Sequence, residues 1–202
     1  MTAFRPLVLL AFLFVLTFQK GVAQGTKMVA STTNKQVTWA RLLVGGALSM
    51  GGDRVAEVYF TNGGSQSVKA GQGISVAVGG EFQIPKVEKL LLRATVGYKY
   101  VTTAADNAHI RLTRVPLDFT ANWMLMDRLR IGAGIAMHRA IQLKADEIGQ
   151  DIRFKGASGP TFEVAYRGVG LQYTAMKYTD QQQQTYSANS IGLTFTAVIP
   201  RR

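Results

Sequence analysis

Apolar and polar residues alternate with a period of two between residues 39 and 200, in eight segments of the chain. Such alternation places the apolar side chains of a strand on one face of a sheet. No segment keeps the 3.6-residue spacing of an amphipathic helix, because glycine and β-branched residues interrupt each candidate. The predicted strands cover residues 39–50, 73–84, 90–102, 110–123, 129–138, 161–167, 169–178 and 187–199.

The fourth predicted strand changes phase along its length. Val115, Leu117 and Phe119 share one face, whereas Ile110 and Leu112 stand one residue out of step with them. An extra residue in a strand moves the following side chains to the opposite face, so we expect a β-bulge near Thr113.

The polar faces of the predicted strands consist mainly of Gly, Ala, Ser and Thr, with single charges of both signs. A soluble, lipocalin-like barrel would expose a face crowded with Lys, Glu, Asp and Asn, while a membrane barrel turns its apolar face outward to lipid. Small residues suit the crowded interior of a narrow cylinder. Aromatic residues lie toward the strand ends, as interfacial girdles require: Trp39, Tyr98, Tyr100, Trp123, Tyr166 and Tyr173. The prediction is an all-β, eight-stranded, antiparallel up-and-down transmembrane β-barrel over residues 39–200.

Long and short connections alternate between the predicted strands. The long ones are residues 51–72, 103–107, 139–160 and 179–186, and the short ones are residues 85–89, residues 126–128 and a turn at Gly168. Outer-membrane barrels have long extracellular loops and short periplasmic turns. The alternation therefore favours the membrane barrel over a β-sandwich with mixed loops.

The N-terminal 23 residues have the pattern of a cleaved signal peptide. Arg5 precedes an apolar stretch over residues 6–18, and Gly21 and Ala23 are the small residues of a cleavage site. A retained anchor helix is the alternative interpretation. Residues 24–38 are polar and without periodicity, which is typical of a flexible leader. The expected destination is the bacterial outer membrane, reached by export.

The composition excludes several kinds of chemistry. The chain has 202 residues, 21 glycines, no cysteine and a formal net charge of +11. Without cysteine there is no disulfide, thiolate metal site or cysteine nucleophile. No apolar run is long enough for a bundle of transmembrane helices. Neither clustered histidines nor paired carboxylates at ligand spacing occur, and we predict no metal or other cofactor.

Four stretches resemble a known family. They are 114–123 (RVPLDFTANW), 129–135 (LRIGAGI), 170–174 (GLQYT) and 189–193 (NSIGL). They are similar to the central and closing hairpins of small porin-like outer-membrane β-barrel proteins, of the eight-stranded OmpA/OmpX-like kind. The resemblance implies a Gram-negative cell envelope and contact with the barrel assembly machinery. One departure is the C-terminus, because family members often end in an aromatic residue and the last aromatic here is Phe195.

Charged residues recur on the predicted inward face. We expect them to form one lumen network of ion pairs, with Glu81 near Arg93 and with Asp118 near Arg114 or Arg130, since unpaired buried charges are costly. Such a network would plug the lumen; a small anion-favouring pore is the alternative. The predicted network comprises Arg41, Glu81, Arg93, Lys99, Arg114, Asp118, Arg130, Glu163 and Arg167. The predicted lipid-facing residues are Leu117, Phe119, Ile131, Ile135, Leu193 and Phe195.

A lipid-modifying enzyme would need a histidine, a serine and a carboxylate together near the outer rim. The candidates are His109, His138, Asp106, Ser158 and the pair Asp146 and Glu147, and no motif fixes their geometry. We therefore predict no enzyme and expect His138 to be a hydrogen-bonded lumen residue.

Basic residues also gather in or beside the predicted extracellular loops. They are Arg54, Lys69, Arg139, Lys144, Arg153 and Lys155. Lipopolysaccharide is anionic and would attract them. Nucleic acid is not an expected partner, because basic and aromatic residues do not interleave. The predicted role is structural, or surface recognition of an unknown ligand through the loops.

Overall fold

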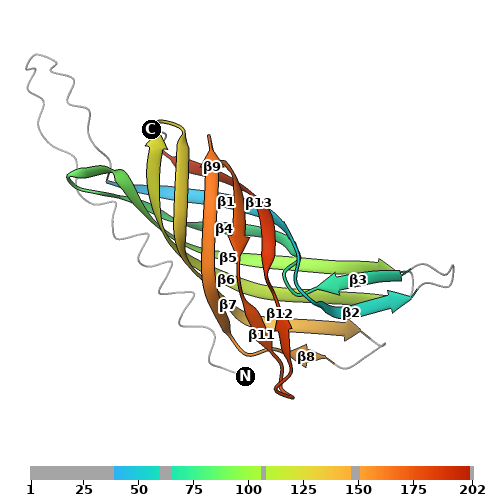
Figure 1. The fold of residues 1–202 in the computed structure, drawn as a ribbon. Coiled ribbons are helices and arrows are strands. Elements are labelled where there is room, and N and C mark those ends of the chain that lie inside the picture. The colour runs from blue at the N-terminus through green and yellow to red at the C-terminus, as the bar shows by residue number, and fades with distance from the viewer. Residues whose placement is uncertain (1–38, 60–64, 106–107, 147–150, 201–202) are drawn as a thin grey trace, which may run out of the picture. The chain divides into compact units, whose positions relative to one another are not determined.

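The computed structural model describes residues 39–59, 65–105, 108–146 and 151–200 (Figure 1). The signal peptide and the leader predicted for residues 1–38 lie outside these residues. Eight strands of the described chain form a closed ring. They are β1 (Ala40–Met50), β4 (Gly73–Ile84), β5 (Val87–Ala105), β6 (Ala108–Met126), β7 (Leu129–Asp146), β9 (Ala157–Tyr166), β10 (Val169–Thr174) and β13 (Ser190–Ile199).

Each ring strand pairs antiparallel with its neighbours in chain order, and β1 pairs with β13 to complete the circle. A closed ring leaves no unpaired strand edge. The eight-stranded antiparallel up-and-down barrel predicted from the sequence is thereby confirmed. No helix of the described residues is long and apolar enough to cross a membrane.

Three of the predicted long loops contain further strands. β2 (Arg54–Tyr59) and β3 (Ser65–Lys69) form a hairpin, as do β11 (Lys177–Thr179) and β12 (Thr185–Ser187), while β8 (Ile152–Arg153) pairs with β7. The seventh predicted strand, residues 169–178, is therefore two strands, since β10 ends at Thr174 and β11 begins at Lys177.

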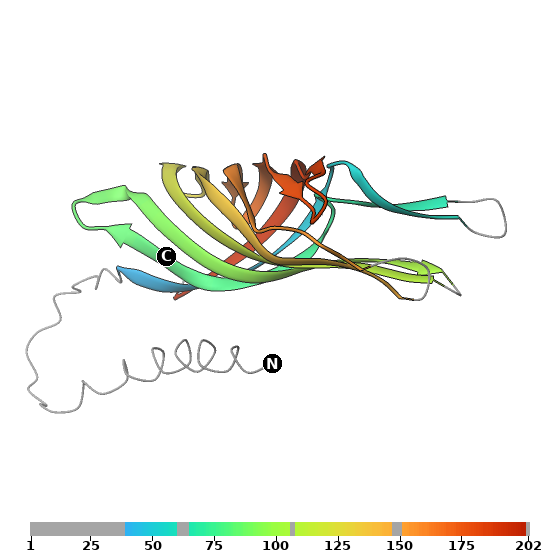
Figure 2. The same ribbon diagram turned by 90° about the horizontal axis from the view of Figure 1, so that it is seen from below.

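The longest strands continue past the ring. β5 and β6 have 19 residues each and β7 has 18, so most of the predicted loop 103–107 is strand. Figures 1 and 2 show these strands and the β2–β3 hairpin projecting at the same end. We call this part the extension: residues 101–112 of β5 and β6, residues 141–146 of β7, and β2, β3, β8, β11 and β12.

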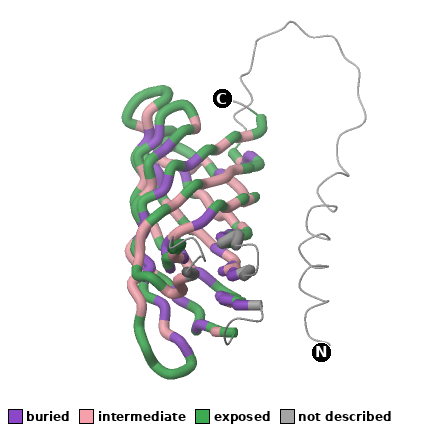
Figure 3. Tube along the Cα trace, turned by 90° about the vertical axis from the view of Figure 1, so that its right-hand side faces the viewer, coloured by how far each residue is buried: buried purple, intermediate pink, exposed green. Residues whose placement is uncertain are grey.

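Within the ring, apolar side chains point outward. Exposed and less exposed residues alternate along the strands (Figure 3). Phe119 is 50% exposed and Leu193 42%, and Ile131, Ile135 and Phe195 are exposed to similar degrees. Leu117 is half-buried between Val96 and Met137, its cross-strand neighbours.

In the extension the two faces exchange character. Ile110 and Leu112 of β6 are buried on the face that carries Arg114, while Arg111 between them points to the outside. In β7, Leu143 and Ala145 are buried and Lys144 is exposed. The buried residues form one core cluster: Val68, Ala70, Val101, Ile110, Leu112, Ala136, Ile141, Leu143, Ala145, Phe154, Ala157, Met176, Tyr178 and Ala188.

A β-bulge lies where the faces exchange. The β6–β7 register shifts between the pairs Thr113–Gln142 and Val115–Arg139, and Ala140 has a φ of 50°. The predicted irregularity near Thr113 therefore exists, but its extra residue belongs to β7. The β5–β6 register runs through Thr113 without a shift. The prediction that β6 itself changes phase is thus wrong: Ile110 and Leu112 are apolar because the interior is apolar at their level.

Candidate functional site in the barrel lumen

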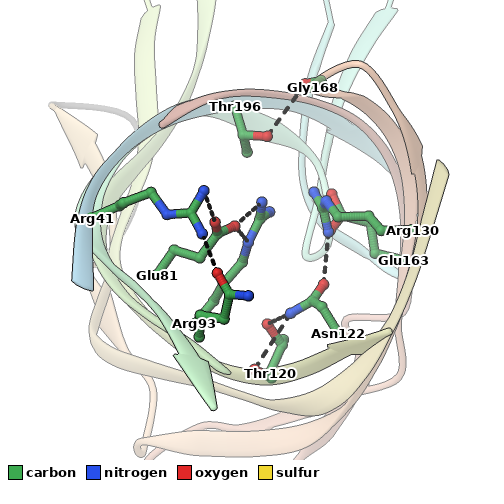
Figure 4. A network of polar contacts seen from close by, with 10 residues as sticks. Arg41, Glu81, Arg93, Thr120, Asn122, Arg130, Glu163, Gly168 and Thr196 are labelled. Atoms are coloured by element: carbon green, nitrogen blue, oxygen red, sulfur yellow. Dashed lines mark hydrogen bonds and ion pairs between the residues drawn. The ribbon is translucent and has the colours of Figure 1, made fainter. Parts of the chain in front are cut away.

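The polar residues of the lumen divide into two halves. The turn half lies toward the short β4–β5, β6–β7 and β9–β10 turns, and the loop half lies toward the extension. In the turn half, Arg93 donates hydrogen bonds to Glu81 Oε2 from Nε at 2.8 Å and from Nη2 at 2.6 Å. Arg41 Nη1 lies 3.8 Å from Glu81 Oε1, and Arg41 Nη2 donates to Gln83 Oε1 at 2.9 Å. Figure 4 shows Arg41, Glu81 and Arg93 pointing into the ring.

A second cluster lies across the lumen from Glu81 (Figure 4). Arg130 Nη1 donates to Glu163 Oε2 and, at 2.7 Å, to Asn122 Oδ1. Asn122 Nδ2 donates to Thr120 Oγ1 at 2.9 Å, and Thr194 donates to Glu163 Oε1. The carboxylates of this half are thus shared among several donors, as buried ion pairs require.

The loop half has a different arrangement. Lys99 and Arg114 are direct cross-strand partners, and both are buried. Lys99 Nζ donates to the carbonyl of Gly71 at 2.9 Å, and Arg114 Nη2 donates to the carbonyl of Gln72. Both carbonyls belong to the segment between β3 and β4, so backbone groups and not carboxylates accept from these cations.

Asp118 does not form the ion pair that was predicted for it. The described residues give Asp118 no ion pair with Arg114 or Arg130, and its carboxylate acts on Lys99 only through the electrostatic field. Asp118 lies opposite Thr95 and Ala136, so neither of its direct cross-strand neighbours is charged. The predicted pairing of Asp118 with an arginine is wrong.

Arg167 is a second correction. It lies in the β9–β10 turn with a φ of 52°, is exposed, and places its guanidinium 5.4 Å from the centre of the Tyr166 ring. The predicted strand 161–167 included this residue, whereas β9 ends at Tyr166. Arg167 is therefore a surface residue at the turn end of the barrel and not part of the lumen network.

Tyr178 of β11 covers the loop half. Its hydroxyl is hydrogen-bonded to His138 Nδ1, and its ring centre lies 5.9 Å from Arg114 Cζ and 5.8 Å from the centre of the Phe154 ring. The side chain is 0% exposed, and this burial raises the pKa of its hydroxyl to about 12. Tyr178 had no predicted role; the available signal was its place at the end of the predicted strand 169–178, on the same face as Gln172 and Thr174.

The residues considered for catalysis do not form one site. Ser158 is exposed on the outer face opposite Met137, while His138 is buried in the lumen and bonded to Tyr178. The other candidates, Asp106, Glu147 and the side chains of His109 and Asp146, lie outside the described residues. In the described part of the chain, no group of three or more metal-binding side chains comes together.

The fold and its surface define a class of protein. This is an eight-stranded antiparallel up-and-down β-barrel with the apolar exterior and polar interior of a transmembrane barrel.

The solved structures that are similar to the chain include three outer-membrane proteins. One is Ail, the attachment invasion locus protein of Yersinia pestis, with 7% identity, 78% of this chain and 97% of that chain covered, and a TM-score of 0.42. Neisserial surface protein A has 12% identity, the same coverages of 78% and 97%, and a TM-score of 0.41. The outer-membrane channel DcaP of Acinetobacter baumannii has 14% identity, coverages of 79% and 46%, and a TM-score of 0.34. No family model and no curated protein matches the sequence. Structural similarities this weak support no inference about function.

Proposed function

We propose that the protein is an outer-membrane β-barrel of a Gram-negative bacterium, with a lumen closed by its own side chains. The observation that carries the proposal is the exchange of faces at the level of Arg114. On the turn side of Arg114 the outer face is apolar, as at Phe119. On the side of the extension the outer face is polar, as at Lys144. A barrel in lipid needs an apolar exterior, and a segment in water needs an apolar interior. One chain that has both crosses from membrane to water at this level.

The proposed role is structural or surface recognition, through an extension with a core of its own. The hairpins of the extension are joined to each other: Asp53 N donates to Ser187 O at 2.7 Å, and Ser187 N donates to Asp53 Oδ2 at 2.6 Å. Tyr178, Phe154 and Ile141 pack beneath them. A packed core supports a surface of fixed shape, which suits recognition better than a set of independent loops.

The contents of the lumen support its proposed closure. An eight-stranded barrel has an interior just wide enough for side chains. The turn half holds the Glu81 and Glu163 clusters, and Tyr178 lies over the loop half. Neither an open path nor a catalytic group is needed to account for these contacts, and we propose no enzymatic activity.

Lipopolysaccharide is the proposed partner of the outer face of the extension. Arg111 and Lys144 are direct cross-strand neighbours there, and Arg153 lies opposite Gln142 in the adjacent pair. Arg139 is exposed at the bulge, next to the apolar exterior. These cations lie at the level where the faces exchange, which is where the phosphates of an outer-leaflet glycolipid would be.

Single cysteines test the position of the membrane, because the chain has no cysteine of its own. In lipid vesicles, we expect a fluorophore on Phe119→Cys to be quenched by brominated acyl chains. A fluorophore on Lys144→Cys should be unaffected by them and should be quenched by aqueous iodide. Quenching of both positions by iodide alone would show that the apolar face does not meet lipid.

Conductance and lipid analysis test the closed, non-enzymatic lumen. We expect a band that shifts on heating in a gel and no persistent current steps in a planar bilayer. Steps that favour anions would support the pore instead, since five inward cations (Arg41, Arg93, Lys99, Arg114 and Arg130) face three carboxylates (Glu81, Asp118 and Glu163). Altered lipid A on overexpression would contradict the non-enzymatic assignment.

A further inference from the structure

The loop half of the lumen holds two buried cations on directly opposite residues. Lys99 of β5 and Arg114 of β6 are cross-strand partners facing the interior. Like charges in this position repel each other. In the turn half, by contrast, Arg93 contacts Glu81 and Arg130 contacts Glu163. Each arginine of the turn half thus shares a buried carboxylate, whereas neither Lys99 nor Arg114 has an ion pair among the residues the structure describes.

The hydrogen bonds of these cations are incomplete. Lys99 Nζ and Arg114 Nη2 each donate to a backbone carbonyl, which carries no net charge. Arg114 is 1% exposed, yet its Nε and Nη1 find no acceptor among the residues the structure describes. Buried donors without acceptors are costly, and more so when charged.

The other titratable groups at this level supply no acceptor to the free donors of Arg114. Asp118 lies four residues from Arg114 on β6, opposite Thr95 and Ala136, and forms no ion pair with a described residue. His138 Nδ1 and the Tyr178 hydroxyl bond to each other. The Tyr178 ring lies over Arg114 and offers a weak electrostatic contact, not a hydrogen-bond acceptor for each free N–H.

We propose that the loop half of the lumen binds a small inorganic oxyanion, such as phosphate, between Lys99 and Arg114 beneath Tyr178. An oxyanion accepts charge-assisted hydrogen bonds from guanidinium and ammonium groups, and its charge offsets their repulsion. Because Tyr178 is fully buried, the ion is enclosed and exchanges only when the β11–β12 hairpin moves. This site does not depend on lipopolysaccharide binding or on any recognition role of the extension.

The test is the stability of the refolded protein in detergent micelles as sodium phosphate replaces sodium gluconate at constant ionic strength. An ion that binds only the folded state stabilises it in proportion to the logarithm of its concentration once the site is saturated. We expect the urea midpoint of the parent protein to rise with phosphate. Arg114→Met and Lys99→Met should lose this rise, while Lys89→Met, at an exposed position beside the β4–β5 turn, should keep it.

Phosphorus NMR gives a direct second measurement. Slow exchange predicts a bound phosphate resonance, separate from free phosphate, in the parent and in Lys89→Met but not in Lys99→Met. This comparison tests the phosphate site even if the Arg114→Met variant does not fold. An equal phosphate response in every variant would assign the effect to general salt stabilisation and overturn the site. A parent with no response and no bound resonance would do the same, with trapped water then satisfying Arg114.

Discussion

Glu81 and Arg93 are direct cross-strand partners on β4 and β5, and both hydrogen bonds between them end on the same carboxylate oxygen. The other oxygen of Glu81 is 3.8 Å from Arg41 Nη1, so one buried carboxylate serves two arginines from the strands on either side. Neighbouring strands of an up-and-down barrel are neighbours in sequence, which is why these three residues meet.

Removing this carboxylate should destabilise the barrel strongly. Glu81→Ala leaves Arg41 and Arg93 buried without a shared counter-charge, and we expect a loss of about 3–5 kcal/mol in the free energy of unfolding. Urea unfolding followed by tryptophan fluorescence measures it. Glu88→Ala is the control, because Glu88 is exposed beside the β4–β5 turn. Equal midpoints for the two variants would contradict the importance of the Glu81 cluster.

The two remaining lumen carboxylates should differ from each other. Glu163 is bonded to Arg130 and Thr194, whereas Asp118 has no ion pair with a described residue. Glu163→Gln should therefore cost on the order of 3 kcal/mol, and Asp118→Asn less than about 1 kcal/mol. The same urea experiment compares them, and a larger loss for Asp118→Asn would mean that the lumen is connected differently.

Charges on the outer face should be costly at mid-strand and tolerated near the extension. Phe119→Arg or Leu193→Arg should lose roughly 2–4 kcal/mol of stability in lipid vesicles, and Ser158→Arg about 0–1 kcal/mol. Ser158 is the matched position because it is also exposed but lies at the start of β9. If all three variants fold into vesicles as well as the parent, the outer face does not contact hydrocarbon.

The bulge residue Ala140 should be sensitive to backbone preference. Its φ of 50° lies in the left-handed region, which glycine enters without the strain that a side chain causes. Ala140→Gly should keep or raise stability by about 1 kcal/mol, and Ala140→Val should lower it. Deleting Ala140 should turn Ile141 and Leu143 outward and expose the extension to limited proteolysis, while leaving the ring intact. A deletion variant as resistant to protease as the parent would refute this account.

The buried hydroxyl of Tyr178 should ionise at a higher pH than the hydroxyl of an ordinary tyrosine. Its pKa of about 12 in the folded protein exceeds the ordinary value of 10.0 because burial disfavours the charged phenolate. The unfolded chain therefore releases this proton first as pH rises. The contribution to stability is complete below pH 10 and is lost between pH 10 and about 12, by on the order of 2 kcal/mol.

Alkaline absorbance titration at the phenolate band measures that ionisation. The difference between the parent and Tyr178→Phe should be one phenol that titrates near pH 12. The variant should also lose less stability than the parent over the same pH range. A difference curve centred near the ordinary tyrosine value would show that Tyr178 is not buried in solution.

The sequence by itself determined the barrel. A pleated strand puts alternate side chains on opposite faces, so the residue pattern of each strand tells which face is apolar, whatever the neighbours are. The outward positions of Phe119, Ile135 and Leu193 follow from this rule alone. So does the meeting of Glu81 with Arg93, because consecutive strands with short turns must pair.

Tertiary structure alone decided the phase of β7 beyond its bulge. Ile131, Ile135, Ile141 and Leu143 all have odd numbers, and a two-residue period assigns them to one face. The extra residue at Ala140 turns Ile141 and Leu143 inward instead. Whether a strand accepts a bulge depends on what its partner strand and the covering hairpins offer, and a single-strand pattern does not contain that information.

Tertiary structure also determined the side-chain contacts in the loop half of the lumen. Tyr178 reaches Arg114 and His138 because β10 ends at Thr174 and β11, which begins at Lys177, places this side chain in the loop half. Asp118 has uncharged direct neighbours, Thr95 and Ala136, and forms no ion pair with a described residue. Glu163 also has uncharged direct neighbours but reaches Arg130 on the diagonal. Long-range register arises from the packing of the whole ring, so these contacts follow only from the assembled barrel.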